Sequence, residues 1–285
     1  MTAPGGYKRM VIGLPQSIAD QAVVDVAADL AEFLNIELLA TFVADAHLQA
    51  LAGFPAAREL RILERGWQAI DLEQIARDLD RAASAARRRF AEAVRSRTIK
   101  TSFDVIAGAD AMASLIRAGD IVAIIEPSHP GEQITRQFTG VVDAALAAAS
   151  AVLVLPRRIA RTAGPVMAVA AGPEDTSIHV ALELAAALKE DLVVVTSAAV
   201  APEIVARARA LAVHLDEVTA HGPPTDVLAT APSPFAVKER LRVINRELLP
   251  DDAAQVFSML HGVPLLVVEP QRIDLASDQE PGEIH

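Results

Sequence analysis

The feature that most constrains the fold is a regular alternation of short apolar runs with helical patterns, present twice along the 285 residues. In the first half, apolar residues recur at helical spacing from Ala22 to Leu34, and helices are also predicted near residues 111–117 and 141–149. Strand–helix alternation of this kind predicts a parallel sheet covered by helices. The candidate strands of this half are residues 10–12, 36–43, 103–106, 121–125 and 152–155.

The second half repeats this scheme at low sequence identity. Residues 139–155 align with residues 252–268 without a gap, and a helical stripe covers residues 180–188. We interpret the chain as a degenerate tandem duplication, with one α/β domain over residues 1–160 and another over residues 163–272. Each domain is predicted to be a doubly wound, five-stranded parallel sheet. The candidate strands of the second domain are residues 166–170, 192–195, 218–220, 235–237 and 265–268.

One long connection, residues 46–97, has no counterpart in the second half. It is predicted to be mostly charged helix, including the segment 59–67 and the arginine cluster 87–89. An arginine cluster can bind an anion, but carboxylates lie nearby in the sequence, and we favour a solvated helix face. Trp67, the only tryptophan, is interpreted as a packing anchor rather than a stacking platform. Residues 273–285 form an acidic tail.

Charge and composition exclude several classes of function. A net charge of −11 argues against general affinity for nucleic-acid backbones. Cysteine is absent, which excludes disulfides, thiolate metal sites and cysteine nucleophiles, and which fits a reducing compartment. The longest uncharged stretch, residues 144–156, is too short for a membrane span, and no long apolar leader precedes Met10. We therefore expect a cytoplasmic protein that binds neither nucleic acid nor membrane.

Motifs that carry chemistry are missing. The sequence contains no G-x-G-x-x-G, no Walker A loop, no G-x-S-x-G elbow and no H-E-x-x-H. His214 and His221 lie seven residues apart without a further acid or histidine at ligand spacing, so no metal site is predicted. Ser128 and His129 follow a candidate strand, but adjacent residues at a strand exit rarely form a nucleophile–base pair. No catalytic residue and no metal ligand are therefore predicted.

Several segments together resemble the universal stress protein family, in a tandem arrangement that covers roughly residues 7–158 and 165–270. The resemblance rests on the first, second and fourth strands of the first half and on the two endings. These segments read KRMVI (8–12), LLATFVAD (38–45), DIVAII (120–125), ASAVLVL (149–155) and HGVPLLVV (261–268). The resemblance implies the adenine nucleotide alpha-hydrolase-like fold. It also implies an intrachain pseudo-dimer, in which residues 152–155 meet residues 265–268 about a two-fold axis.

The resemblance further implies that the family's nucleotide motif, Gly-x-x-Gly-x9-Gly-Ser/Thr, is degenerate here. In the family, the glycines let backbone amides approach phosphate and the hydroxyl binds a phosphate oxygen. Aligned from the closing strand, these positions fall in the first half on Ile125, Ser128, Phe138 and Thr139. In the second half they fall near Lys238, Leu241, Asp251 and Asp252. The family's aspartate at the end of the first strand falls near Leu14, and near Gly172 or Pro173 in the second half.

The expected function is that of a non-enzymatic stress-response or regulatory protein. It has lost standard ATP binding, needs no cofactor and acts through an unidentified protein partner or small ligand. The alternative is a divergent ATP- or AMP-binding protein that uses the first domain only, with Val43 near the base and with Ser128 and Thr139 at phosphate. A third reading, an enzyme of the wider adenine-nucleotide-binding fold group, has no residue set to support it. A homodimer of such pseudo-dimers is compatible with either of the first two readings.

Overall fold

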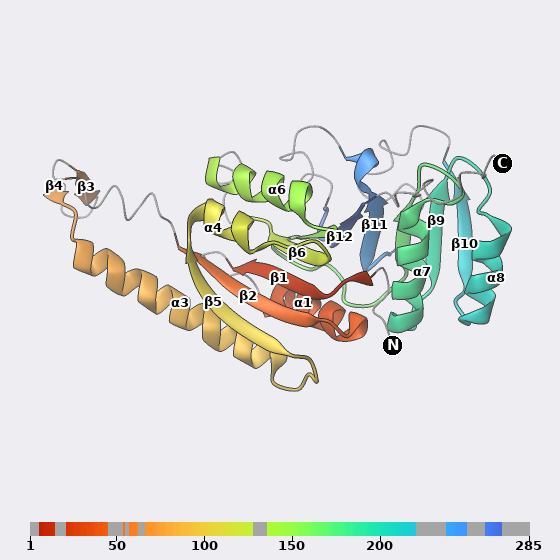
Figure 1. The fold of residues 1–285 in the computed structure, drawn as a ribbon, viewed down its shortest axis with the longest axis horizontal. Helices are drawn as coiled ribbons and strands as arrows, with labels where there is room; N and C mark the ends of the chain where they lie inside the picture. Colours follow the sequence, from red (N-terminus) through yellow and green to blue (C-terminus); the bar gives the residue numbers. More distant parts are fainter. Residues whose placement is uncertain are drawn as a thin grey trace, which may run out of the picture.

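The strands form one sheet of ten strands and a separate sheet of two (Figure 1). The computed structural model describes residues 6–14, 21–44, 54, 57–61, 66–127, 136–220, 238–249 and 260–269. In the large sheet the strand order is β10-β9-β8-β11-β12-β7-β6-β1-β2-β5. Among the described helices, none is both long enough and apolar enough to cross a membrane.

The first half of the chain supplies five parallel strands of the large sheet. Pairing runs from β5 through β2, β1 and β6 to β7, all parallel. These elements match the predicted strands and helices within a few residues. Their bounds are β1 Arg9–Leu14, α1 Gln21–Leu34, β2 Glu37–Ala44, β5 Thr101–Ala107, α4 Gly108–Leu115, β6 Asp120–Ile125, α6 Arg136–Ala148 and β7 Ala151–Leu155.

The second half supplies the other five parallel strands, and it corrects one strand prediction. The fourth strand of this half is β11, Leu241–Asn245, whereas the candidate at residues 235–237 lies outside the described residues. A single turn of 3-10 helix, Arg246–Leu248, follows β11. The remaining bounds are β8 Val166–Val169, α7 Thr176–Leu188, β9 Leu192–Thr196, α8 Pro202–Ala210, β10 Leu215–Thr219 and β12 Leu265–Val268.

The two halves meet through their last strands, as the family resemblance implies. β12 pairs with β7 in antiparallel orientation, so the two five-stranded sheets are one continuous sheet rather than two separate ones. Both strands are buried along their whole length. The register pairs Leu265 with Val154, Leu266 with Leu153, Val267 with Val152 and Val268 with Ala151.

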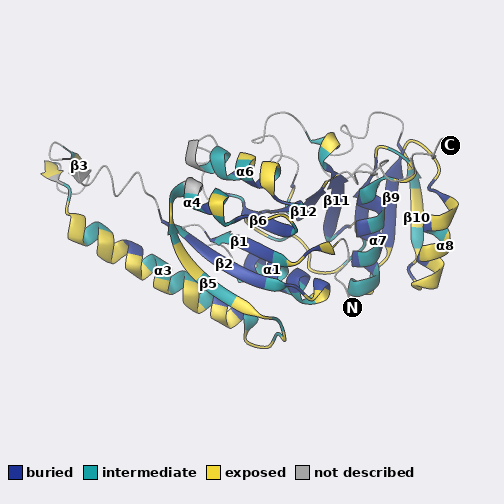
Figure 2. Ribbon diagram, in the orientation of Figure 1, coloured by how far each residue is buried: buried dark blue, intermediate teal, exposed yellow. Residues whose placement is uncertain are grey.

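Helices cover the sheet, and the strands at its centre are buried on both faces (Figure 2). Buried side chains of α1, α7, α8 and the C-terminal part of α3 belong to one apolar cluster, and those of α4 and α6 belong to the other. Fully buried parallel strands are expected to be continuous Val, Ile and Leu runs, as in β6 and β7. The sheet's two outer strands, β5 and β10, carry exposed residues instead.

Side-chain and loop contacts reinforce the strand pairing between the halves. The amide of Ala160 donates to the carbonyl of Gly262 at 2.8 Å. Arg246 donates to the Glu269 carboxylate at 2.9 Å and to the carbonyl of Ala149, next to the C-terminal end of α6, at 3.0 Å. Gly164, in the segment that links the halves, has a φ of +125°, and a Cβ there would lie 2.4 Å from the carbonyl oxygen of Lys238. Glycine at this position therefore allows the linker to pass close to the second half.

Buried arginine–carboxylate pairs stabilise the amino ends of the strands in both halves. Arg9 and Asp120 are neighbours in the β1–β6 register, and their side chains make two contacts, Nη2–Oδ2 at 2.5 Å and Nε–Oδ1 at 3.2 Å. In the second half, Arg242 of β11 donates to Glu239 from Nε at 2.8 Å and from Nη2 at 2.5 Å. Hydrogen-bonded pairing of this kind is what makes buried charge tolerable.

The long connection, residues 46–97, is only partly helical. Its helix, α3, covers Leu72–Val94 and begins at the N-cap Asp71, which accepts a hydrogen bond from the amide of Gln74 at 3.0 Å. The segment predicted to be helical upstream is instead a hairpin of β3, Arg58–Arg61, and β4, Gly66–Ala69. Trp67 lies on this hairpin and is exposed, so it is not the packing anchor that the sequence suggested.

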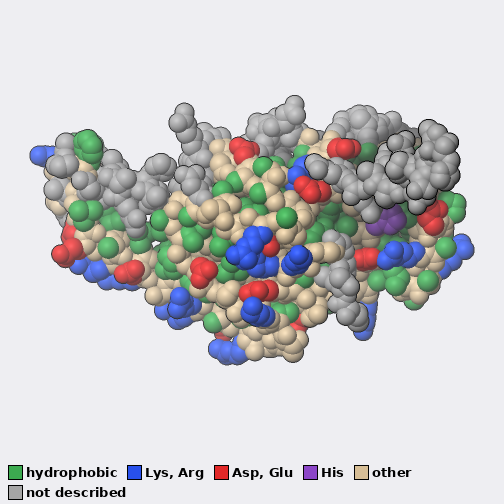
Figure 3. Space-filling view, viewed as in Figure 1, with side chains coloured by type: hydrophobic (Ala, Val, Ile, Leu, Met, Phe, Trp, Pro, Cys, Tyr) green, Lys and Arg blue, Asp and Glu red, His purple; other side chains and the backbone are tan. Residues whose placement is uncertain are grey.

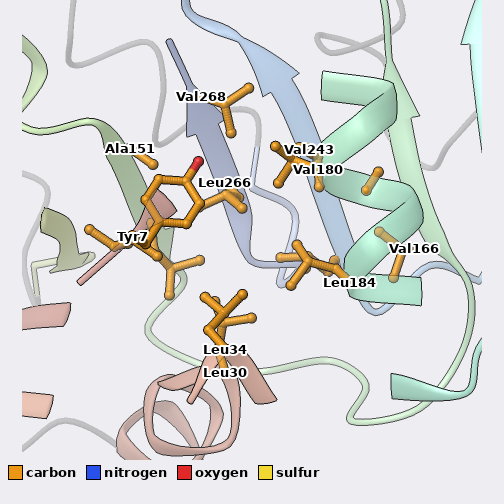
Figure 4. Close-up of a cluster of buried hydrophobic side chains, with 14 of the residues drawn as sticks. Tyr7, Leu30, Leu34, Ala151, Val166, Val180, Leu184, Val243, Leu266 and Val268 are labelled. Atoms are coloured by element: carbon orange, nitrogen blue, oxygen red, sulfur yellow. The ribbon is translucent and has the colours of Figure 1, made fainter. Parts of the chain in front are cut away.

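Tyr7, the only tyrosine, packs over the junction of the halves (Figure 4). Its ring lies among side chains of both halves, including Leu34 of α1 and Leu266 and Val268 of β12. Burial, with smaller contributions from the carboxylates of Glu269 and Glu183, raises the pKa of Tyr7 to about 12. The state of this phenol therefore reports on the integrity of the junction.

We predict that Tyr7 ionises at about pH 12 in the native protein and near 10 in denaturant. Between these two values the unfolded chain loses the phenolic proton and the folded chain keeps it, so the free energy of unfolding falls as pH rises. The total loss is about 3 kcal/mol. Tyrosinate absorbance measures the titration directly, and Tyr7→Phe serves as the control because it removes both the signal and this part of the pH dependence. A native midpoint close to 10 would contradict the placement of the ring.

A second prediction concerns a fragment of residues 1–161, which exposes the edge of β7. Because an uncovered apolar strand edge invites pairing, the fragment is expected to sediment as larger species than the full chain at equal concentration. A fragment that associates no more than the full chain would show that β12 is not needed to cover β7.

Candidate functional site

The sheet has two points where ligands commonly bind in doubly wound folds. In each half the chain runs outward from a central strand and then returns to that strand's other side, which leaves a crevice at the carboxyl ends of the two strands. These crevices lie between β1 and β6 in the first half and between β8 and β11 in the second. Because β7 and β12 are antiparallel, the strands of the two halves point in opposite directions, and the two crevices open at opposite ends of the strands.

The crevice of the first half has an apolar floor. Leu14 ends β1 and Ile125 ends β6, and both side chains are buried. Gly13 precedes Leu14, and a Cβ there would lie 3.8 Å from the terminal methyl carbon of Met112. The space above the strand is therefore occupied by the side chain of α4. Neither Leu14 nor Ile125 offers a polar atom beyond its backbone.

The structure distributes the predicted nucleotide-binding residues over separate elements. Val43 is half-buried at the end of β2, and Thr139 is half-buried in the first turn of α6. In the sheet order, β1 and β6 come between β2 and the strand that follows α6. Phe138, at one of the glycine positions, packs against the apolar cluster beneath α6. Ser128 lies outside the described residues.

Sequence reasoning missed one buried polar atom in this half. Thr41 of β2 is fully buried, and its hydroxyl has no hydrogen-bond partner among the described residues. It lies on the same face of β2 as Leu39, which faces the α4 side of the sheet. An unsatisfied buried hydroxyl costs about 1–3 kcal/mol. The sequence signal was a threonine inside a run of apolar residues.

The crevice of the second half is polar. Asp175, the N-cap of α7, accepts hydrogen bonds from the amides of Ser177 and Ala171, both at 2.9 Å. Asn245, which ends β11, donates from Nδ2 to Asp175 Oδ1 at 3.4 Å. The Oδ1 of Asn245 accepts from the amide of Glu247 at 3.2 Å. One short network thus connects the exit of β8 to the exit of β11.

The polar side-chain atoms in this crevice, which a ligand could otherwise bind, form hydrogen bonds within the protein. Both oxygens of Asp175 and both polar atoms of Asn245 are engaged, and the buried Ser177 hydroxyl donates to the carbonyl of Val169 at 3.4 Å. Within the described ranges, no group of three or more His, Asp or Glu residues is placed to hold a metal ion. The arrangement fixes the geometry of the two strand exits.

The register corrects the alignment of the nucleotide motif in the second half. Ile125 pairs with Leu155 at the end of the fifth strand of its half, and Asn245 pairs with Val268 in the same way. Asn245 is therefore the counterpart of Ile125. Lys238, which was aligned to that position, comes before β11 rather than after it. The segment between the fourth and fifth strands is shorter in the second half, which the gapless alignment could not show.

The same correction applies to the other aligned positions. Leu241 is the first residue of β11, whereas Asp251 and Asp252 lie outside the described residues. The acidic group at the exit of β8 is Asp175, a few residues beyond Gly172 and Pro173. The Asp-Thr-Ser sequence before a helical stripe is an N-cap signal that could have identified it.

The histidines do not form a site in the described part of the chain. His214 lies 3.2 Å from Asp216 beside the exposed strand β10, and its proposed neighbour His221 lies outside the described residues. His261 precedes β12, where partial burial and the nearby Arg242 guanidinium lower its pKa, opposed by Glu239.

A shallow groove lies at the junction of the halves, away from both crevices. It is lined by Leu30 and Phe33 of α1, by Arg161 of the linker and by Arg240 and Leu241 at the start of β11. Arg240 is paired with Glu190 at 3.4 Å. The groove combines an apolar floor with charged side chains of both signs, because Asp29 of α1 also lines it.

Comparison with known proteins identifies the fold. No family model and no curated protein matches the sequence. Among solved structures, a universal stress protein from Archaeoglobus fulgidus DSM 4304 aligns with a TM-score of 0.57 at 12% identity, over 92% of this chain and 97% of that chain. The fold is that of a universal stress protein. The alignment spans both halves, so the universal stress protein fold accounts for the whole tandem arrangement. A functionally unknown protein from Pseudomonas aeruginosa PAO1 aligns over 93% of both chains, with a TM-score of 0.45 and 14% identity.

We predict that the polar network of the second half is structural. Asp175→Ala removes the cap of α7 and the partner of Asn245, and should lower the free energy of unfolding by about 1–2 kcal/mol. The adjacent, exposed Glu174→Ala is the matched control and should have little effect. Denaturant unfolding measures both variants. Equal stability of the two variants would show that Asp175 is free for another role.

Proposed function

We propose that this chain is a regulatory protein of universal stress type that does not bind ATP in the manner of the family. The observation that carries the proposal is the apolar floor of the first crevice. Leu14 and Ile125 are buried where the family resemblance implies an aspartate and a glycine. A leucine side chain offers no acceptor to a nucleotide, and a side chain at Ile125 occupies space that a phosphate would need.

The second crevice supports the same proposal for a different reason. The Asp175 carboxylate lies at the N-terminus of α7, where a phosphate would otherwise accept hydrogen bonds from the helix amides. A fixed negative charge at this position competes with a phosphate for those amides and repels it. Asn245, the counterpart of the first glycine of the motif, is tied to that carboxylate.

The output that we propose is contact with a protein partner or small ligand rather than catalysis. The described polar residues of the second crevice are held by backbone capping, which suits a fixed scaffold better than proton transfer. The groove beside Arg161, with its apolar floor and charged rim, is the surface at the junction of the halves that we propose for such a contact. We also propose the cytoplasm as the place of action, because a chain without cysteine fits a reducing compartment.

One observation favours weak nucleotide binding by the first half as a second candidate function. Thr139 is half-buried in the first turn of α6, where a hydroxyl can meet phosphate, and Val43 is half-buried at the end of β2. In this case the first half alone would bind ATP or AMP, weakly.

The proposal predicts little thermal stabilisation by ATP. Stabilisation grows as RT ln(1 + [L]/Kd), so a Kd close to the ligand concentration contributes about 0.4 kcal/mol. For a chain of this size that is a shift in Tm of about 1 °C. Differential scanning fluorimetry with millimolar ATP tests this expectation. A shift of several degrees with micromolar ATP would overturn the proposal.

Two threonine variants locate any residual binding. Thr139→Ala should abolish it if the first half is responsible, whereas the matched Thr176→Ala, at the start of α7 in the second half, should leave it unchanged. If the wild type hydrolyses ATP and a single substitution in a crevice abolishes that hydrolysis, the protein is instead an enzyme.

A further inference from the structure

The outer part of α3 and the β3–β4 hairpin form an arm that projects beyond the large sheet (Figure 1). We define the arm as Phe54, residues 57–61 and residues 66–84. The two hairpin strands pair only with each other and do not join the large sheet. A two-stranded hairpin is marginally stable alone in water and needs another surface to pack against. Of the three buried side chains of α3, Phe90 and Ala93 pack into the core of the first half and lie toward the C-terminal end, whereas Leu79, within the arm, belongs to neither core cluster.

Exposed apolar side chains gather on this arm and on the neighbouring edge strand. Of the six large hydrophobic side chains that are exposed among the described residues, four are found here. They are Phe54, 67% exposed, Trp67, 65%, Leu72, 52%, and Val105 of β5, 54%. The space-filling view shows hydrophobic side chains at the tip of the arm (Figure 3). Clustering of this kind marks an interaction surface rather than a scatter of single exposed residues.

Charges along α3 are unevenly divided between its two ends. The first half of the helix and its cap contain more acidic than basic residues, whereas the second half contains several arginines and Glu92 as its only acid. Acidic side chains are visible at the outer end of the arm (Figure 3). Asp80, Arg88 and Arg95 are exposed, and none of them forms an ion pair within the described residues.

One exposed ridge of α3 carries its charges in a self-complementary order. When a second copy of the ridge is placed antiparallel to the first, acidic residues face basic ones. Its residues recur at helical spacing, and all of them are exposed; Glu73 also pairs with Arg77 of the same ridge at 3.3 Å. Asp80 and Arg88 are equidistant in sequence from Ser84, and so are Glu73 and Arg95. The centre of the ridge, residues 82–86, contains only alanine and serine, which allow two helices to approach closely. The ridge consists of Glu73, Arg77, Asp80, Ser84, Arg88, Ala91 and Arg95.

The geometry points to a second copy of this chain as the partner of the arm. The two α3 helices cross antiparallel at Ser84, with Asp80 of each copy against Arg88 of the other and Glu73 against Arg95. A two-fold axis repeats every contact, which is the property of an isologous interface. The hairpin of each copy then lies beyond the C-terminal end of the other copy's α3, where Trp67 gains cover.

Reciprocal charge reversal tests this interface in the full-length protein. The wild type should show a concentration-dependent dimer by sedimentation, weakened by salt because the pairs are exposed. Asp80→Arg and Arg88→Glu each place like charges together at two symmetric sites, and each should raise the dimer Kd by about tenfold or more. The double variant Asp80→Arg/Arg88→Glu restores opposite charges and should return the Kd toward that of the wild type.

A matched control and a spectroscopic readout complete the experiment. Asp143→Arg makes the same charge change on an exposed position of α6 and should leave the dimer unchanged. Trp67, the only tryptophan, should become less accessible to a fluorescence quencher as the dimer forms. Circular dichroism checks that each variant is folded.

Three outcomes would overturn the proposal. These are a wild type that stays monomeric up to its solubility limit, single reversals that do not weaken the dimer, or a double variant that fails to recover it. A monomer in which Trp67 becomes protected only on adding another protein would assign the arm to a different partner.

Discussion

The antiparallel ladder between β7 and β12 is the contact on which the rest of the structure depends. Each half of the chain ends in a strand that is apolar on both faces, and such a strand cannot remain an edge in water. Pairing the two strands removes both edges and makes one sheet out of two halves, with apolar clusters that both halves share. Tyr7 and Arg246 then pack or bond across the same junction.

The orientation of this ladder also decides where the two halves can bind ligands. Because the ladder is antiparallel, the strands of the two halves point in opposite directions. Their carboxyl ends therefore lie at opposite ends of the strands, and the two crevices are independent. They have diverged in chemistry: the first has Leu14 and Ile125 at its floor, and the second has Asp175 and Asn245. The surfaces that remain distinctive are the inter-half groove and the arm.

Much of the sheet could be predicted from sequence because buried parallel strands are continuous apolar runs. β6, β7 and β12 are such runs, and the pairing of β7 with β12 was expected from the family resemblance. β11 was missed because its sequence, Leu-Arg-Val-Ile-Asn, places charged and amide groups in a buried strand. Arg242 is tolerated there because Glu239, three residues earlier, accepts its hydrogen bonds, a pairing that apolar periodicity does not reveal.

The candidate site and the arm were harder to predict. The N-cap Asp175 has a recognisable local signal, but its link to Asn245 depends on two strands that are distant in sequence. The hairpin of the arm was taken for helix because charged residues alternate with apolar ones in both structures. Trp67 gave no hint of its exposure, since a lone tryptophan is usually a core residue.

Native-state hydrogen exchange at the junction tests the central claim most directly. If β7 and β12 bind the halves into one cooperative unit, the backbone amides of Leu153 and Leu266 exchange only through global unfolding, with the same free energy as amides at the centre of β6. Exchange of β7 and β12 at a clearly lower free energy, with β6 still protected, would mean that the halves separate while remaining folded. That result would contradict the account of a single sheet built on this ladder.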